Sequence, residues 1–354
     1  MRYLVYGTGA VGALLGGRLA LGGHPVTFLA RPRVAEALER DGLHLGGVIP
    51  AAWLPEPKVA RSLDQAFAGA EPPEVILLTV KAYDCEAAAE RIGAASDNPP
   101  PVVCLLNGVG NEATLAARLG RERVIAAALT TAVLMPEPGR VRVERERGLG
   151  LAADHRLALR LASEFTEAGM RVRLHPNPGR MKWSKLMTNV VANATSAITG
   201  WTPRDVFSHA GLYRLEIEAL REVVRVMRAD GLRPENLAGV PIRLMTLALA
   251  LPPRVSQPVL MRAVASGRGG KRPSFHYDIG RGRSEVTWLN GAVVRQGARL
   301  DILTPANAVL TEVMLGLVHR RLSPEAFLNK PKALLGQAQA AGVPGIRGYN
   351  AAAE

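Results

Sequence analysis

Three polar side chains recur at intervals of four in an otherwise apolar segment: Lys185, Asn189 and Asn193. On one helix this spacing places them along one face, offset by about 40° per step. An ammonium and two amides are costly to bury unless a polar ligand lies in front of them. The segment is therefore a candidate site for a keto acid, with a polar stripe facing water as the alternative.

A phosphate-binding turn is predicted near residue 10. An apolar strand runs directly into Gly7-Thr8-Gly9-Ala10-Val11-Gly12, and an amphipathic stretch follows. In this pattern the first glycine allows a tight turn, the second lets the backbone approach a pyrophosphate, and the third lets helix and strand pack closely. The helix amino terminus then faces the phosphates with N–H groups and a partial positive charge. We expect these six residues to bind a dinucleotide, with a plain glycine-rich turn as the alternative.

The end of the second predicted strand indicates which dinucleotide. Proteins selective for NAD usually place a carboxylate there, whereas this chain has Arg31 and, two residues on, Arg33. A guanidinium binds a 2′-phosphate through charge-assisted, forked hydrogen bonds. We therefore expect NADPH/NADP⁺ as the cofactor, with a solvated surface arginine as the alternative.

Two further strand ends carry polar residues. Lys81 follows the apolar run that begins at Val75, and Asn107 follows the run that begins at Val102. Ligands of open α/β sheets lie beyond the carboxyl ends of the strands, so both residues are expected near the cofactor, and Asn107 near the nicotinamide or the substrate. The alternatives are a solvated lysine at a helix start and a simple turn asparagine.

The order of elements predicts two domains. Up to residue 177, apolar strands alternate with helical patterns, which is typical of an α/β domain with a mainly parallel sheet of Rossmann type. The predicted strands span 2–6, 25–30, 75–80, 102–106, 124–128, 141–144, 149–152 and 171–174, and the predicted helices 10–21, 34–41, 85–92, 111–119 and 155–167.

A breaker-rich stretch at 175–180 predicts a hinge. Residues 178–330 then form a second, all-helical domain, with helices at 182–198, 206–229, 242–251, 286–296 and 306–320. Thr304-Pro305 predicts a helix start with a capping hydroxyl. The Ala- and Gly-rich residues 331–354 are expected to be a loosely ordered tail.

Composition narrows the function class. The net charge of +13 is compatible with nucleic-acid binding, but the charges are spread along many helices without interleaved aromatic residues, which favours an enzyme that attracts anionic ligands. No membrane partner is expected, and a cytoplasmic location is the default. Cys85 and Cys104 are expected to be reduced, without a catalytic role. No cluster of His, Cys and carboxylates has metal-ligand spacing, so no metal is expected.

Taken together, the motifs resemble those of the ketopantoate reductase (2-dehydropantoate 2-reductase) family. They run in order along most of the chain and comprise the glycine turn, Arg31, Val80-Lys81-Ala82, Asn107-Gly108, Lys182-Trp183-Ser184-Lys185-Leu186, Asn189, Asn193, Pro273-Ser274, Asp278, Gly282-Arg283-Ser284-Glu285 and Leu289-Asn290-Gly291. The resemblance implies NADPH-dependent reduction of 2-dehydropantoate to pantoate, in the pathway to pantothenate and coenzyme A. It also implies a Rossmann domain joined to a helical domain like that of 6-phosphogluconate dehydrogenase, with the active site between them.

The resemblance also implies roles for individual residues. Lys185 is the expected general acid, and Glu285 is expected to orient the substrate hydroxyl or assist the proton step. Asn107, Asn189, Asn193 and Ser274 are expected to hold substrate oxygens. For Glu285, a carboxylate in the first turn of a solvated helix is the alternative. A monomer or a homodimer is expected.

Departures from the family pattern concern the substrate. Thr287 stands where the family has an acidic residue, the segment from Ser274 to Glu285 is short, and residues 267–272 form a basic loop. The carboxyl-terminal extension also exceeds the common length. Two alternatives therefore stay open: a reductase of another 2-keto acid or 3-hydroxy acid, and a catalytically silent NADP(H)-binding redox sensor.

Overall fold

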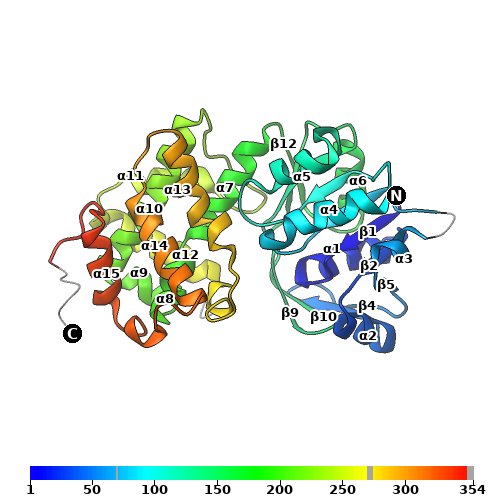
Figure 1. The fold of residues 1–354 in the computed structure, drawn as a ribbon, viewed down its shortest axis with the longest axis horizontal. Helices are drawn as coiled ribbons and strands as arrows, with labels where there is room; N and C mark the ends of the chain where they lie inside the picture. Colours follow the sequence, from blue (N-terminus) through cyan, green and yellow to red (C-terminus); the bar gives the residue numbers. More distant parts are fainter. Residues whose placement is uncertain (69–70, 269–273, 349–354) are drawn as a thin grey trace. The chain divides into compact units, whose positions relative to one another are not determined.

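The computed structural model describes residues 1–68, 71–268 and 274–348, which fall into two compact units. The first unit comprises Met1–Lys182 together with Asn236–Val240, and the second comprises Trp183–Glu235 together with Pro241–Glu354. The first unit is built around sheets and the second is helical (Figure 1). The predicted combination of a mainly parallel Rossmann-type sheet and a helical part is confirmed.

An eight-stranded sheet forms the centre of the first unit, in the order β12-β11-β8-β7-β6-β1-β2-β5. Neighbouring strands are parallel except for β8 and β11. The order reverses at β1, and in such sheets ligands bind where the strand order reverses. The strands are β1 (Tyr3–Tyr6), β2 (Val26–Leu29), β5 (Lys58–Ala60), β6 (Val75–Leu78), β7 (Val102–Cys104), β8 (Val124–Leu129), β11 (Leu149–Ala152) and β12 (Val172–His175).

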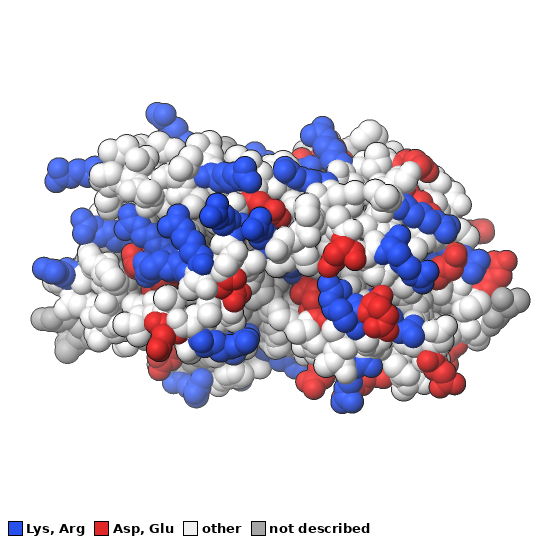
Figure 2. Space-filling view, turned by 90° about the horizontal axis from the view of Figure 1, so that it is seen from above, with Lys and Arg blue, Asp and Glu red and all other residues white. Residues whose placement is uncertain are grey.

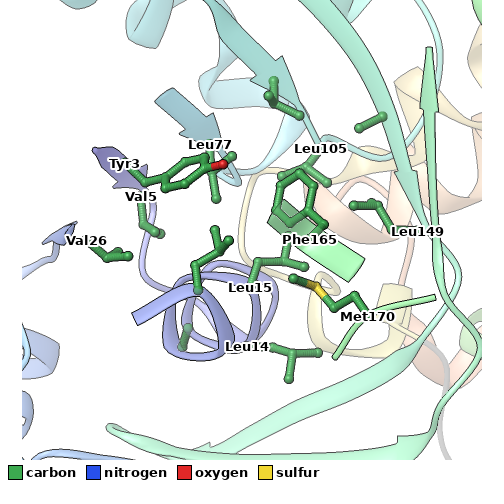
Figure 3. Close-up of a cluster of buried hydrophobic side chains, with 14 of the residues drawn as sticks. Tyr3, Val5, Leu14, Leu15, Val26, Leu77, Leu105, Leu149, Phe165 and Met170 are labelled. Atoms are coloured by element: carbon green, nitrogen blue, oxygen red, sulfur yellow. The ribbon is translucent and has the colours of Figure 1, made fainter. Parts of the chain in front are cut away.

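Helices cover both faces of this sheet, which explains why its central strands are apolar throughout. On β6, Val75 and Leu77 join one buried cluster, whereas Ile76 and Leu78 join another, because successive side chains point to opposite faces. Figure 3 shows the first of these clusters, with Leu77 near Tyr3 and Val5 of β1. The helices of this unit are α1 (Ala10–Leu21), α2 (Pro32–Asp41), α3 (Leu63–Phe67), α4 (Cys85–Ala95), α5 (Asn111–Leu119) and α6 (Ala158–Glu167), with short 3₁₀ turns η1 (Ala82–Asp84) and η2 (Arg121–Arg123).

A second, four-stranded sheet in the first unit is absent from the sequence-based prediction, apart from one of its strands. Its order is β4-β3-β10-β9, with β3 (Leu43–Gly47), β4 (Ala52–Leu54), β9 (Ala132–Glu137) and β10 (Arg140–Arg145). The strands β3, β4, β5 and β9 and the helix α3 were missed, because these segments are short and half exposed or rich in glycine, so their sequence periodicity is weak.

The second unit contains helices and, within its described residues, no strand of its own. Its helices are α7 (Pro178–Val190, which begins in the first unit), α8 (Asn193–Thr199), α9 (Pro203–Ser208), α10 (Ala210–Ala229), α11 (Ile242–Ala250), α12 (Pro253–Arg268), α13 (Asn290–Arg299), α14 (Pro305–Val318) and α15 (Pro331–Ala340), with 3₁₀ turns η3 (Ser274–Tyr277), η4 (Glu285–Trp288) and η5 (Pro324–Ala326). Among the described helices, each is too short or too polar to cross a bilayer.

Three helices that the sequence predicts as continuous are broken in the structure. The predicted helix 182–198 is interrupted at Ala192, whose φ of +47° is left-handed. The predicted helix 206–229 changes direction at His209, whose side chain accepts a hydrogen bond from Leu212 N. The predicted helix 286–296 consists of η4 followed by α13. Periodicity misses such breaks because the apolar pattern continues across them.

Three boundary predictions need correction. The expected hinge at 175–180 contains the start of α7 at Pro178, since proline is favoured at the first helical position. The expected loose tail from 331 instead begins with α15, which buries Leu334 and Leu335. At Thr304-Pro305 the helix start is confirmed, but the Thr304 side chain makes no capping hydrogen bond.

Candidate functional site

The glycine turn lies at the carboxyl end of β1, between that strand and α1, where the predicted dinucleotide site requires it. Gly7 has a φ of +104°, a conformation that favours glycine. Thr8 is buried, and its hydroxyl donates to Leu29 O of β2 at 2.9 Å. Thr79, just beyond β6, donates its hydroxyl to Gly7 O at 2.7 Å. These two hydroxyls fix the turn between the strands on either side of β1.

The space around each glycine matches its predicted role. A Cβ on Gly12 would lie 2.5 Å from Gly7 O, so only glycine lets α1 pack this closely against the turn. A Cβ on Gly9 would meet nothing within 4 Å, which leaves open space beside the backbone where a pyrophosphate would lie. Gly9 is also the N-cap of α1, and the first turn of α1 contains no acidic residue. The turn therefore fits an anionic dinucleotide.

Arg31 stands exposed at the end of β2, as the cofactor prediction requires. It is the N-cap residue of α2, and Pro32 follows at the first helical position. The Arg31 side chain is 89% exposed, and its nearest carboxylate is Asp84 of η1, 3.5 Å from Nη2 to Oδ2. An exposed guanidinium with one long ion pair is able to turn toward a 2′-phosphate. Arg33 is exposed as well.

Lys81 and Asn107 lie beyond the carboxyl ends of β6, which neighbours β1 in the sheet, and of β7, which neighbours β6. Lys81 follows β6, is exposed, and is the N-cap residue of η1. Asn107 follows β7 and is exposed. Its carbonyl oxygen accepts a hydrogen bond from Asn111 Nδ2 at 2.9 Å, which closes the turn that leads into α5.

A buried lysine with no role in the sequence-based prediction lies beneath this turn. Lys182 Nζ donates to Leu106 O at 2.7 Å and to Ala127 O at 3.3 Å, and it lies 2.9 Å from Glu112 Oε1. Burial by itself lowers the pKa of Lys182, but the Glu112 carboxylate outweighs it and raises that pKa above its ordinary value. The ammonium therefore stays charged inside the first unit.

In the second unit, Lys185 and Asn189 lie one turn apart on α7 and are both half-buried. Leu186, Met187 and Val190 between and beside them are buried, so the two polar groups border the apolar side of the helix. The predicted arrangement of these two residues on one helix face is confirmed.

Asn193 does not continue this face, which corrects the prediction of three residues on one helix. It is the first residue of α8, after the break at Ala192, and it is 4% exposed. Its Oδ1 accepts from Phe275 N at 3.3 Å, and its Nδ2 donates to Ser274 Oγ at 3.3 Å. The fold therefore brings Asn193 and Ser274 together. Ser274 is exposed, and the buried Asn193 fixes its position through this hydrogen bond.

Glu285 is the first residue of η4 and is 3% exposed, so the alternative of a solvated helix start is wrong. The preceding residue, Ser284, caps η4 by accepting from Val286 N and donates to Asp278 Oδ2 at 2.8 Å. Pro273 and residues 269–272 of the basic loop lie outside the described residues. Thr287 follows on η4 and is half-buried.

Glu216 of α10 is a further residue that the sequence does not single out. Its Oε2 accepts from Ala192 N at 2.7 Å, and its other oxygen accepts from the Thr195 hydroxyl. Glu216 thus caps α8 and holds the helix break that places Asn193. The sequence signal for Glu216 is a glutamate at a position of the helical pattern that otherwise carries apolar residues, since an acidic side chain is rarely buried without a partner.

The cysteines are free thiols, as expected, and both are buried. Burial, together with the Glu112 carboxylate, raises the pKa of Cys85 to about 12 and that of Cys104 well above its ordinary value. Both thiols stay protonated and are poor nucleophiles. The residues that the structure describes include no group of three or more His, Cys, Asp or Glu able to hold a metal.

Two family models match the chain. Residues 3–153 match "Ketopantoate reductase PanE/ApbA", and residues 179–317 match "Ketopantoate reductase PanE/ApbA C terminal". The 2-dehydropantoate 2-reductase of Halobacterium salinarum is 30% identical over 328 residues, which cover 89% of this chain and 98% of that protein. The 2-dehydropantoate 2-reductase of Pyrococcus horikoshii is 26% identical, over 88% of this chain and 95% of its own length.

Solved structures agree with these matches. A PanE/ApbA family ketopantoate reductase from Ralstonia eutropha superposes with a TM-score of 0.76 at 29% identity, covering 91% of this chain and 99% of that one. D-Mandelate dehydrogenase with NADH and anilino(oxo)acetate superposes with a TM-score of 0.73 at 18% identity, covering 90% and 99%. The second likeness extends to the fold alone.

Proposed function

The chain belongs to the ketopantoate reductase family, and on that premise we propose that it reduces 2-dehydropantoate to pantoate with NADPH. Members of this family are oxidoreductases that act on a CH–OH group. The observation that carries the proposal is the half-buried pair Lys185 and Asn189 on α7, in a chain whose first unit holds a dinucleotide turn. A protein that only senses NADP(H) needs no ammonium and amide paired in this way.

NADPH is the proposed cofactor, and when bound it supplies the hydride. Gly7, Gly9 and Gly12 leave room for its pyrophosphate. The first hydrogen bond of the α1 ladder is donated by Ala13 N to Gly9 O, so the N–H groups of Ala10 and Val11 precede the ladder and point toward the phosphates. Arg31 binds the 2′-phosphate, and Lys81 and Asn107 contribute from the ends of β6 and β7.

Lys185 is the proposed general acid. Its ammonium holds a proton close to the carbonyl oxygen of the keto acid, favours the negative charge that develops there, and transfers the proton to that oxygen. Asn189 and Ser274 donate hydrogen bonds to other substrate oxygens, and Glu285 orients the substrate hydroxyl. Asn193 acts through Ser274, because its amide is already engaged by Ser274 and Phe275 N.

Turnover with defined substrates tests the proposal. We expect the absorbance of the reduced nicotinamide of NADPH to fall when 2-dehydropantoate is added to the purified protein with NADPH. With NADH in place of NADPH, the absorbance should fall more slowly. A panel of other branched 2-keto acids serves as the comparison. Faster turnover of another keto acid would change the substrate while keeping the reaction, and no turnover of any of them would support the sensor instead.

A further inference from the structure

We propose that Lys182 is a positioning residue that holds the turn Asn107–Gly110 in its working conformation. This inference rests on the proposed function, because that function places Asn107 in contact with the nicotinamide or the substrate. All of the contacts that carry it lie within the first unit.

The turn needs external contacts because its own backbone is permissive. Gly108 has a φ of +85° and Gly110 a φ of +98°. Two glycines so close together have many accessible conformations, so the sequence of the turn alone does not select one. Asn107, the first residue of the turn, is exposed.

Contacts from outside hold the turn at both ends. At its entrance, Leu106 O, the carbonyl immediately before Asn107, accepts from Lys182 Nζ at 2.7 Å. At its exit, Asn111 Nδ2 donates to Asn107 O at 2.9 Å. Glu112, the residue after Asn111, pairs with the same lysine at 2.9 Å. One ammonium therefore joins the two ends of the turn.

Lys182 is suited to positioning and not to proton transfer. An ammonium has three N–H donors. The three acceptors around Lys182 are Leu106 O, Ala127 O of β8 and Glu112, and the side chain is almost completely buried. These groups, all of the first unit, enclose the ammonium of Lys182, whereas Lys185, one turn further along α7, is half-buried.

The cost of burial supports a specific role. Removing an ammonium and a carboxylate from water costs several kcal/mol per ion, and apolar replacements of buried pairs are often neutral or stabilising. The pair Lys182–Glu112 is therefore a poor device for stability alone. What the pair does is fix the direction of the Leu106 carbonyl, and this in turn fixes the backbone of Asn107.

The test compares the double variant Lys182→Met/Glu112→Gln, which removes the charged pair without leaving a lone charge, with wild type and with Lys58→Met, an exposed lysine of the same unit. We expect kcat for 2-dehydropantoate to fall at least about tenfold, because misplacement by about 1 Å costs this much or more. The Kd for NADPH, measured by nicotinamide fluorescence, should change less than about threefold, since the glycine turn and Arg31 are untouched.

Hydrogen exchange provides a readout besides activity. Amides of residues 105–111 should exchange faster in the double variant, while those of α1 and β1 keep their wild-type rates. Asn111→Ala, which releases the exit of the turn without altering charge, should reproduce the fall in kcat and the faster exchange of 105–111. Lys58→Met should change neither.

The inference is overturned if the double variant keeps the wild-type kcat and the wild-type exchange of 105–111. If the wild-type protein itself fails to reduce 2-dehydropantoate, the proposed function is wrong, and the exchange rates alone then decide the role of Lys182. Should the double variant not fold, Glu112→Gln alone carries the test, because it weakens the link between the Lys182 ammonium and the exit of the turn.

Discussion

Two lysines one turn apart on α7 have different environments, which match the different roles that we propose for them. Lys182 is enclosed by two carbonyls and a carboxylate, whereas Lys185 is half-buried and borders the apolar side of the helix. Residue type alone does not distinguish a proton donor from a tether, because both are ammonium groups on similar helix positions. The burial and the contacts of each ammonium distinguish them.

Lys185→Ala is expected to lower kcat by about two to four powers of ten, because the carbonyl oxygen then loses both its proton donor and the positive charge that stabilises it. Steady-state rates with NADPH and 2-dehydropantoate provide the measurement. Lys330→Ala, an exposed lysine of the second unit, is the matched control and should keep the wild-type rate. Wild-type turnover in Lys185→Ala would remove Lys185 from the mechanism.

Arg31→Ala is expected to raise the KM for NADPH by about ten- to a hundredfold and to leave the KM for NADH nearly unchanged. The reason is that the variant loses a charge-assisted hydrogen bond to the 2′-phosphate, which only NADPH has. Both constants are measured at saturating keto acid. Arg40→Ala, an exposed arginine on α2, serves as the control. An equal loss for both nucleotides would show that the 2′-phosphate is bound elsewhere.

At the scale of elements, α10 organises the second unit by capping two other helices. Glu216 accepts from Ala192 N at the start of α8, and Glu222, two turns on, accepts from Ala306 N and Asn307 N at the start of α14. Buried carboxylates at helix amino termini satisfy N–H groups that the helices leave open. One helix thus fixes both where α8 begins, with Asn193, and where α14 begins.

The pH dependence of stability tests the Glu222 cap. Burial outweighs the hydrogen bonds from Asn307 and Ala306 and raises the pKa of Glu222 to about 7, from an ordinary value of 4.5. A raised carboxyl pKa favours folding below the ordinary value, and this contribution is lost as pH rises through the folded value. The free energy of unfolding of wild type relative to Glu222→Gln should therefore decrease between about pH 5 and pH 8.

Urea denaturation of both proteins at several pH values measures this difference. Glu222→Gln is neutral throughout the range, so subtraction removes the contribution of every other titrating group that the two proteins share. A difference that stays constant, or that grows with pH, would contradict the assignment.

At the scale of the whole molecule, the net charge of +13 acts on ligands that are both anionic. On the face shown in Figure 2, Lys and Arg gather over the helical unit, whereas acidic and basic residues are mixed over the sheet unit. Positive potential raises the encounter rate of anions and is screened by salt.

We expect kcat/KM for 2-dehydropantoate to fall several-fold when NaCl rises from about 50 to about 500 mM, because the Debye length shortens from about 14 to about 4 Å. Since kcat is measured at saturation, it should change little. Replacing chloride by acetate separates screening from specific chloride binding. A kcat/KM that is independent of ionic strength would mean that the charge does not guide the substrate.

Much of the fold followed from local sequence. The glycine turn and the apolar strands of the large sheet could be predicted because their signals lie within a few residues, and central strands buried on both faces are apolar throughout. The same holds for the i, i+4 spacing of Lys185 and Asn189, which one turn of helix suffices to place on one face.

The tertiary structure alone decided where helices break and what polar groups contact. The break at Ala192 depends on Glu216, which is distant in sequence. The position of Lys182 depends on a carbonyl of β8, on the carbonyl of Leu106 after β7 and on Glu112. Hydrogen bonds between distant segments leave no periodic trace in the sequence, because any local pattern is compatible with several such partners. For this reason the sequence by itself determined the family motifs and the local elements, and the tertiary structure decided which polar groups each lysine contacts.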